Sequence, residues 1–180
     1  NELAFSGDKL LELMHATPPA SVATRLQEAL ERYEGASACI VAMEKYESGN
    51  ADAFVQQKAA VAFRIGMTKL RLAQVLNDTE SRLAKEWAAG AIEEFEYVIE
   101  HVNDVQREEF DETIYFLPHH AFVNLAACQV ILNKIEDGRI AVERLSKLIQ
   151  QGSLDKHPNI RQYFLKDVSH LEKLFEHQNW

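Results

Sequence analysis

The chain has 180 residues, of which 47% are hydrophobic and 26% are charged. This length and composition are typical of one packed domain, so we expect residues 1–180 to form a single domain and exclude disorder throughout. Seven glycines and four prolines are too few turn-forming residues for a many-stranded sandwich or barrel. The chain should therefore be all-α.

The charge argues against nucleic acid as a partner, because 19 Lys and Arg against 28 Asp and Glu leave a formal net charge of -9. No apolar run reaches the roughly 18 residues of a membrane span, and no basic region followed by an apolar stretch opens the chain. We expect a soluble, cytoplasmic protein. Because the chain begins at Asn1 rather than Met, a fragment of a longer protein and a processed form both stay open.

Apolar residues recur at helical spacing along most of the chain and predict six substantial helices, or seven if Asp8 to His15 forms a short leading one. No segment has the alternation of a strand. In chain order, the six helices are expected over residues 18–46, 50–76, 84–102, 118–132, 137–149 and 158–175. The first of them contains Gly35, where the helix could bend, and ends near Ser48-Gly49.

Each helix carries an apolar stripe that we expect to be buried, from Val22 to Met43 in the first helix and from Ile140 to Ile149 in the fifth. The stripe from Ala84 to Val102 is the clearest. In the second helix, small residues such as Ala59 and Gly66 would let a neighbouring helix approach closely.

Local signals set the remaining boundaries. The acidic stretch 103–116 is interpreted as a connection with room for one helical turn. Pro118 and Pro158 should open helices, Asp137 should cap the helix between them, and Gly152 should end it. A loop of about four residues between the helices at 118–132 and 137–149 makes these two antiparallel neighbours.

Two segments of the chain align with each other. Ala91 to Ile99 (AIEEFEYVI) and Ala141 to Ile149 (AVERLSKLI) share a small residue, an aliphatic residue and large apolar residues at matching offsets. Each follows a helix with a small residue on its packing face, FRIG at 63–66 and NLAAC at 124–128.

This pattern resembles the tetratricopeptide-repeat family, whose first helix has an Asn-Leu-Gly or Asn-Leu-Ala core and whose second has Ala-Ile followed by a large apolar residue. The better match runs from Asn124 to Ile149, with about three extra residues around 133–138. The pair from Gly66 to Ala91 departs further, by about a dozen residues. Roughly 90 of the 180 residues are covered.

The resemblance implies a short α-solenoid of stacked antiparallel hairpins, with a compact helical bundle as the alternative. Close contact between its helices would depend on the small residues Gly66, Ala91, Ala126 and Ala141. It also implies a groove along the first helices of the hairpins that binds a peptide or a partner protein.

Several polar residues are candidates for that groove. In the resemblance to tetratricopeptide repeats, Asn124 and Arg64 fall at positions that face the groove. The lysines with which such domains bind the terminal carboxylate of a partner are not at the matching positions. Gln129, Asn124 and His120 could instead hydrogen-bond an extended peptide or a partner helix, alongside Arg64 and Lys69.

The seven histidines do not predict a metal site. His119 and His120 are adjacent, so their side chains diverge by about 100° on a helix. Glu12 and His15 have the offset of a carboxylate-bridged di-iron site, but no second Glu-x-x-His pair exists. We interpret the histidines as surface or helix-cap residues.

Paired glutamates offer an alternative function, a magnesium-dependent all-helical nucleotide pyrophosphohydrolase. The Glu-x-x-Glu pairs are Glu28 with Glu31, Glu31 with Glu34, Glu44 with Glu47, Glu93 with Glu96, and Glu109 with Glu112. This is a modest excess over chance, and most of these carboxylates lie opposite the apolar stripes, where they should face water.

The sequence also lacks the usual motifs for nucleophilic catalysis and for phosphate binding. There is no Gly-x-Ser-x-Gly elbow and no glycine-rich phosphate loop. Cys39 and Cys128 lie in apolar helical stretches that should bury both thiols and raise their pKa, although a disulfide stays open. We therefore expect no catalytic residue, no metal and no cofactor.

The sequence thus predicts a non-catalytic scaffold for protein–protein interaction. A further alternative is a structural subunit whose terminal helix, ending at Phe175 and Trp180, docks onto a larger chain or a second copy.

Overall fold

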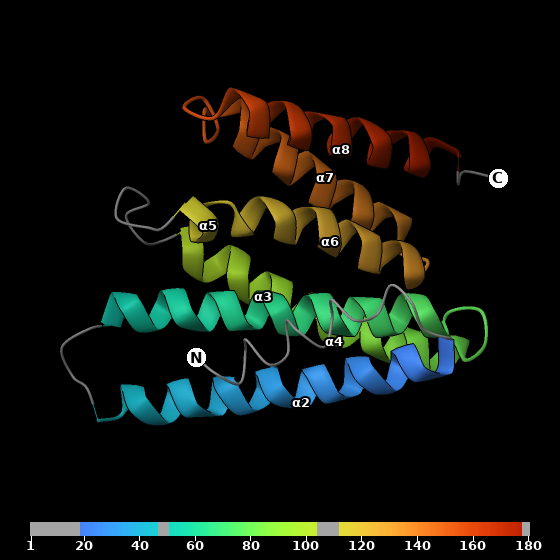
Figure 1. Cartoon of the computed structure of the whole chain (residues 1–180). Coiled ribbons are helices and arrows are strands. Elements are labelled where there is room, and N and C mark those ends of the chain that lie inside the picture. Colours follow the sequence, from blue (N-terminus) through green and yellow to red (C-terminus); the bar gives the residue numbers. More distant parts are fainter. Residues whose placement is uncertain (1–18, 47–50, 104–111, 178–180) are drawn as a thin grey trace.

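The computed structural model describes residues 19–46, 51–103 and 112–177, and within these ranges every regular element is a helix (Figure 1). The elements are α2 (Pro19–Glu44), α3 (Ala51–Leu76), α4 (Ser81–Asn103), α5 (Glu112–Tyr115), α6 (Leu117–Ile131), α7 (Ile135–Gln150) and α8 (Pro158–His177). The predicted all-α class is confirmed. The leading helix at Asp8–His15 and the stop at Ser48-Gly49 lie outside the described residues.

The helices follow one another across the molecule in chain order, from α2 at one edge to α8 at the other (Figure 1). α2 packs on α3, α3 on α4, α4 on α6, α6 on α7, and α7 on α8. α6 also touches α3 and α8, so it has neighbours on several sides. This position explains why α6 buries residues around most of its circumference rather than along one stripe.

α2 runs without interruption through Gly35, because its buried residues contact α3 along most of its length. Leu26, Tyr33 and Ile40 form this contact and belong to a hydrophobic cluster shared with α3. Burial of such side chains contributes about 1.5–3 kcal/mol each, which outweighs the roughly 1 kcal/mol cost of one glycine. The helix therefore has no break at Gly35.

Two apolar residues predicted to be buried are exposed. Met43 is 49% exposed and Ile140 is 47% exposed. At about 100° per residue, Ile140 points about 140° away from the buried Leu145 and lies outside the contact arc of α7. Met43 is on the buried side of α2, about 20° from Ala36, but it lies in the last turn, beyond Ile40, the last buried residue of this helix. These two predictions were wrong.

The small residues lie where helices approach closely. Gly66, Ala91, Ala126 and Ala141 are all buried, as predicted. A Cβ atom at Gly66 would lie 2.8 Å from the Cε1 atom of Phe95 in α4. Close packing of α3 on α4 therefore depends on the missing side chain at this position.

The ends of α6 and α7 show one difference from the prediction. Pro118 lies in the first turn of α6, and Gly152, with φ of +84°, follows the end of α7, as expected. α7 begins at Ile135 with Lys134 at its N-cap, so Asp137 is not the cap. Its carboxylate lies instead in the first turn, where the helix dipole favours a negative charge.

None of the helices in the described ranges is long and apolar enough to cross a bilayer.

Candidate binding face

Side chains from α3, α6 and α8 meet in series on one side of the molecule. The His120 ring of α6 lies 6.2 Å from the Phe63 ring of α3 and 6.2 Å from the Tyr163 ring of α8, measured between centroids. It also meets Phe164 edge-on at 4.7 Å. We call Phe63, His120, Asn124, Tyr163 and Asp167 the three-helix face.

The exposure of this face differs along the series. Tyr163 is 54% exposed, whereas Phe63, His120, Asn124 and Asp167 are half-buried. Asn124 and Asp167 join the face because each is four residues after a ring of the series, about 40° away on the same side of its helix. The face therefore offers an aromatic surface flanked by an amide and a carboxylate.

Electrostatics within the face are set by partial burial. Burial lowers the pKa of His120, and the nearby Asp167 carboxylate opposes this by raising it. Burial raises the pKa of Asp167, while His120 and His170 lower it. Desolvation is the larger cause for both groups, so the face disfavours a charge on the imidazole and on the carboxylate.

Of the residues that the sequence proposed for a groove, His120 and Asn124 lie on this face. Arg64 follows Phe63 in α3 and is half-buried. The Nδ2 atom of Asn124 donates a hydrogen bond to the His120 carbonyl at 2.8 Å, which orients the amide along its own helix.

Lys69 and Gln129 lie elsewhere. The Nζ atom of Lys69 is 2.8 Å from the Glu94 carboxylate, so its side chain faces α4. Gln129 is nine residues after His120, which places it about 180° around α6. It is buried against α7 near Gly138, and its Oε1 atom has no hydrogen-bond partner. The structure therefore does not bring these two residues to the face.

His119, which the sequence placed at the surface or at a cap, is fully buried. Its Nε2 atom lies 2.9 Å from the Ser153 Oγ atom, and its ring lies 5.2 Å from Phe164. Tyr115 donates a hydrogen bond to the Ser153 carbonyl beside it. The surface interpretation was wrong for His119, because the segment between α7 and α8 folds over the start of α6.

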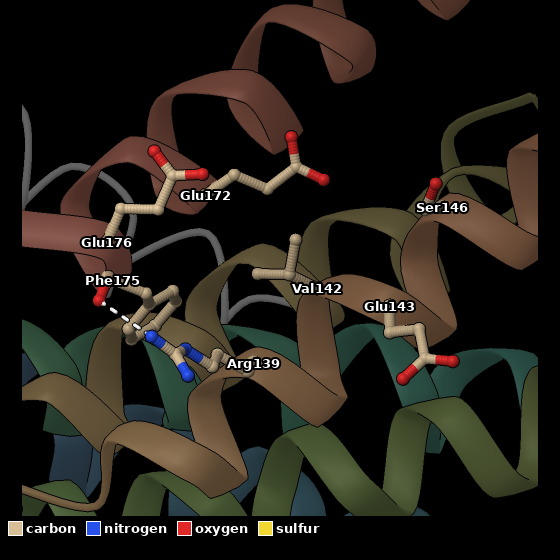
Figure 2. A pocket seen from close by; sticks show the side chains of 7 residues that line it. All are labelled: Arg139, Val142, Glu143, Ser146, Glu172, Phe175 and Glu176. Atoms are coloured by element: carbon tan, nitrogen blue, oxygen red, sulfur yellow. Dashed lines mark hydrogen bonds between the residues drawn. The ribbon is translucent and has the colours of Figure 1, made fainter.

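A second candidate is the groove between α7 and α8 that Figure 2 shows, with a volume of about 550 Å³. Its lining consists of Arg139, Val142, Glu143, Ser146, Glu172, Phe175 and Glu176. The Nη2 atom of Arg139 donates to the Phe175 carbonyl at 3.2 Å, and Glu143 pairs with Lys147 at 2.9 Å. Because the groove forms only between two packed helices, the sequence analysis did not group its residues as a site.

The carboxylates of this groove do not form a metal site. Across the described ranges, no group of three or more His, Cys, Asp or Glu residues is placed to hold a metal ion. Glu28, Glu31, Glu34, Glu93 and Glu96 of the Glu-x-x-Glu pairs are exposed, as expected. Glu47, Glu109, Glu12 and His15 lie outside the described residues.

The two thiols are both free, and only one is buried. Burial raises the pKa of the Cys128 thiol to about 12, as the apolar sequence around it predicted. Cys39 is exposed on α2, so the prediction that both thiols are buried was wrong for this residue. It lies six residues after the buried Tyr33, about 120° away from it around the helix.

Sequence analysis missed Phe63, Tyr163 and Asp167 as members of the face. Tyr163 immediately precedes the buried Phe164, which places it about 100° from the buried stripe of α8. This position could have marked Tyr163 as a residue at the edge of the stripe, but not as a neighbour of His120.

Comparison with known proteins finds no family model that matches this chain, and neither a curated protein nor a solved structure matches it.

Proposed function

We propose that the chain is a non-catalytic scaffold that binds a peptide or a helix of a partner protein on the three-helix face. The observation that carries this proposal is the series of rings from Phe63 through His120 to Tyr163, which spans three helices and leaves Tyr163 54% exposed. Aromatic side chains of this kind are enriched among the residues that dominate binding energy. A tetratricopeptide-like solenoid remains our preferred description of the architecture.

The polar residues of the face suit a peptide backbone. The Asn124 amide can exchange hydrogen bonds with main-chain groups, and the Asp167 carboxylate can accept one. Arg64 follows Phe63 in α3, and we propose that its cation also contacts the bound segment. Such convergent polar groups around an aromatic surface fix the orientation of an extended or helical segment.

The nucleotide pyrophosphohydrolase is less well supported. A magnesium site needs carboxylates that converge from different helices. The described Glu-x-x-Glu pairs on α2 and α4 are exposed instead. Magnesium-dependent hydrolysis of nucleoside triphosphates that is lost on Glu93→Gln or Glu28→Gln would overturn the scaffold proposal.

The direct test is selection of binders from a random peptide library on the purified chain, followed by fluorescence anisotropy with each selected peptide. Tyr163→Ala and Arg64→Glu should each weaken binding about tenfold or more, as expected for a central anchor worth about 1.4 kcal/mol. Tyr46→Ala is the matched control, because Tyr46 is 89% exposed just beyond α2, at the opposite edge of the molecule. Unchanged affinity for Tyr163→Ala, or a library that yields no binder, would contradict the proposal.

A further inference from the structure

A histidine cluster attaches the beginning of α8 to the rest of the molecule. His119 and His120 of α6 both contact the Phe164 ring of α8, at centroid distances of 5.2 Å and 4.7 Å. Phe164 is fully buried between them and its other neighbours. The first half of α8 therefore rests on two imidazoles as well as on the main hydrophobic cluster, to which Phe164 belongs.

The segment that leads into α8 depends on the same cluster. The Ser153 hydroxyl lies 2.9 Å from His119 Nε2, and Tyr115 donates to the Ser153 carbonyl. The His157 ring meets the rings of Tyr115 at 5.9 Å and Phe116 at 5.1 Å. Residues 151–157 and the start of α8 are thus held against α5 and α6 by histidine contacts, by the Tyr115–Ser153 hydrogen bond and by the fully buried Leu154.

The second half of α8 is attached by apolar contacts and by one hydrogen bond from α7. Val168, Leu171 and Phe175 are buried in the main hydrophobic cluster. Arg139 of α7 donates a hydrogen bond to the Phe175 carbonyl at 3.2 Å. None of these contacts requires a neutral histidine, so the two halves of α8 should respond differently to acid.

We propose that His119 and His120 form an acid-sensitive latch, which holds residues 151–167 against α5 and α6 while the imidazoles are neutral and releases them when the imidazoles gain protons. Burying an imidazolium in this aromatic environment costs free energy, whereas in the released state water solvates the charge. Release would also remove Tyr163 and Asp167 from the three-helix face. The latch itself is defined by α8 attachment and does not depend on what binds there.

The groups that surround the two imidazoles decide the direction of the effect. His119 contacts Tyr115 of α5, Phe116 between α5 and α6, Ser153 before α8 and Phe164 of α8. His120 faces Phe63 of α3, with Arg64 next in that helix, and Tyr163, Phe164 and Asp167 of α8. Arg144 of α7 lies over Phe122 instead, 5.1 Å from its ring. Asp167 is an anion that acts on His120, and it favours the charged form of that imidazole.

The direction of the His120 pKa shift determines how the attachment of α8 depends on pH. Burial lowers its pKa below the ordinary value of 6.5, so attachment is fully favoured above about pH 6.5 and is lost as the pH falls toward the lower value. Asp167 has the opposite sign, because its pKa is raised above 3.8. Its contribution is fully present below 3.8 and is lost as the pH rises through the raised value, so it opposes the effect of the histidine on acidification.

Hydrogen exchange measured by mass spectrometry on the full chain tests the latch. After correction for intrinsic exchange rates, the protection of amides in 160–168 should fall between about pH 7 and pH 5, by at most about tenfold per pH unit for each histidine that stays neutral while attached. Amides of α3 should keep their protection. A flat profile in 160–168, or an equal loss in α3 that indicates global unfolding, would overturn the proposal.

Variants identify the groups responsible. His120→Gln and His119→Gln should each flatten the pH dependence, and Asp167→Asn should enlarge the loss of protection at a given pH because it removes the anion that favours the charged imidazole. His101→Gln, at an exposed position on α4, is the control and should behave as the original chain does. If His119→Gln does not fold, His120→Gln and Asp167→Asn still decide the matter. Unaltered pH profiles in both of them would refute the latch.

Discussion

The substitution Gly66→Ala tests the close approach of α3 and α4. A Cβ atom at this position would lie 2.8 Å from Phe95 Cε1 and 3.1 Å from both Cδ1 and Cζ. Carbon atoms in contact normally lie about 3.5–4.0 Å apart, so the ring would have to withdraw by roughly 0.7 Å. Phe95 is fully buried and packs edge-on against Phe63 at 5.8 Å, which leaves it little room to move.

Two opposing effects determine the size of the change. Overpacking of this kind costs about 1–3 kcal/mol. Replacing a helical glycine with alanine favours folding by about 0.5–1 kcal/mol. Gly90→Ala isolates the second effect, because a Cβ atom there would meet only the flexible Lys69 side chain, at 3.6 Å. The difference between the two variants is therefore the steric cost alone.

Urea denaturation followed by circular dichroism measures both variants. Gly90→Ala should raise the free energy of unfolding by about 0.5–1 kcal/mol, and Gly66→Ala should fall about 1–3 kcal/mol below it. In thermal unfolding, the melting temperatures of the two variants should differ by about 2–4 °C for each kcal/mol of this difference in free energy, for a chain of this size. If Gly66→Ala stabilises the protein as much as Gly90→Ala does, the argument that α3 and α4 require a glycine at this contact is incorrect.

Three further predictions concern single side chains. Cys39 should react with a thiol reagent at about pH 8, whereas Cys128 should not. The pKa of about 12 leaves Cys128 with about a thousandfold less thiolate than a thiol with the ordinary pKa of 9.0. Two reactive thiols in the native protein would contradict this prediction. Gly138→Ala should lower the free energy of unfolding by about 1 kcal/mol or more in urea titrations, since its Cβ atom would lie 2.5 Å from Phe175 Cζ. Lys69→Ala should lower the free energy of unfolding by about 1 kcal/mol in the same titrations and leave peptide affinity unchanged, because the ammonium group faces α4. Weaker peptide binding would show that Lys69 belongs to the binding surface.

Most of the helices could be predicted from the sequence because helical periodicity is a local property. The stripe in α4 was predicted residue by residue, and Ala84, Phe95 and Val102 are buried as expected. A single stripe was not sufficient for α3, which also buries Val61 and Leu72 against α2. Periodicity shows that a helix has a buried side, but not how many neighbours it will have.

The candidate site was predicted only in part for the same reason. The sequence singled out His120 and Asn124, and these lie together because they are one turn apart in α6. It also grouped Gln129 with them, although nine residues of helix place that side chain on the opposite side. Phe63 and Tyr163 are 57 and 43 residues away from His120 along the chain, and no local pattern indicates that their rings meet.

The amino-acid sequence by itself determined the all-α class, the approximate helix ends and the small residues at which backbones approach, since each depends on neighbours within a few turns. The tertiary structure decided the burial of His119, the exposure of Cys39 and Ile140, and the meeting of rings from α3, α6 and α8. Those outcomes depend on the rotation of each packed helix about its own axis. That rotation follows from the combined contacts of all its neighbours.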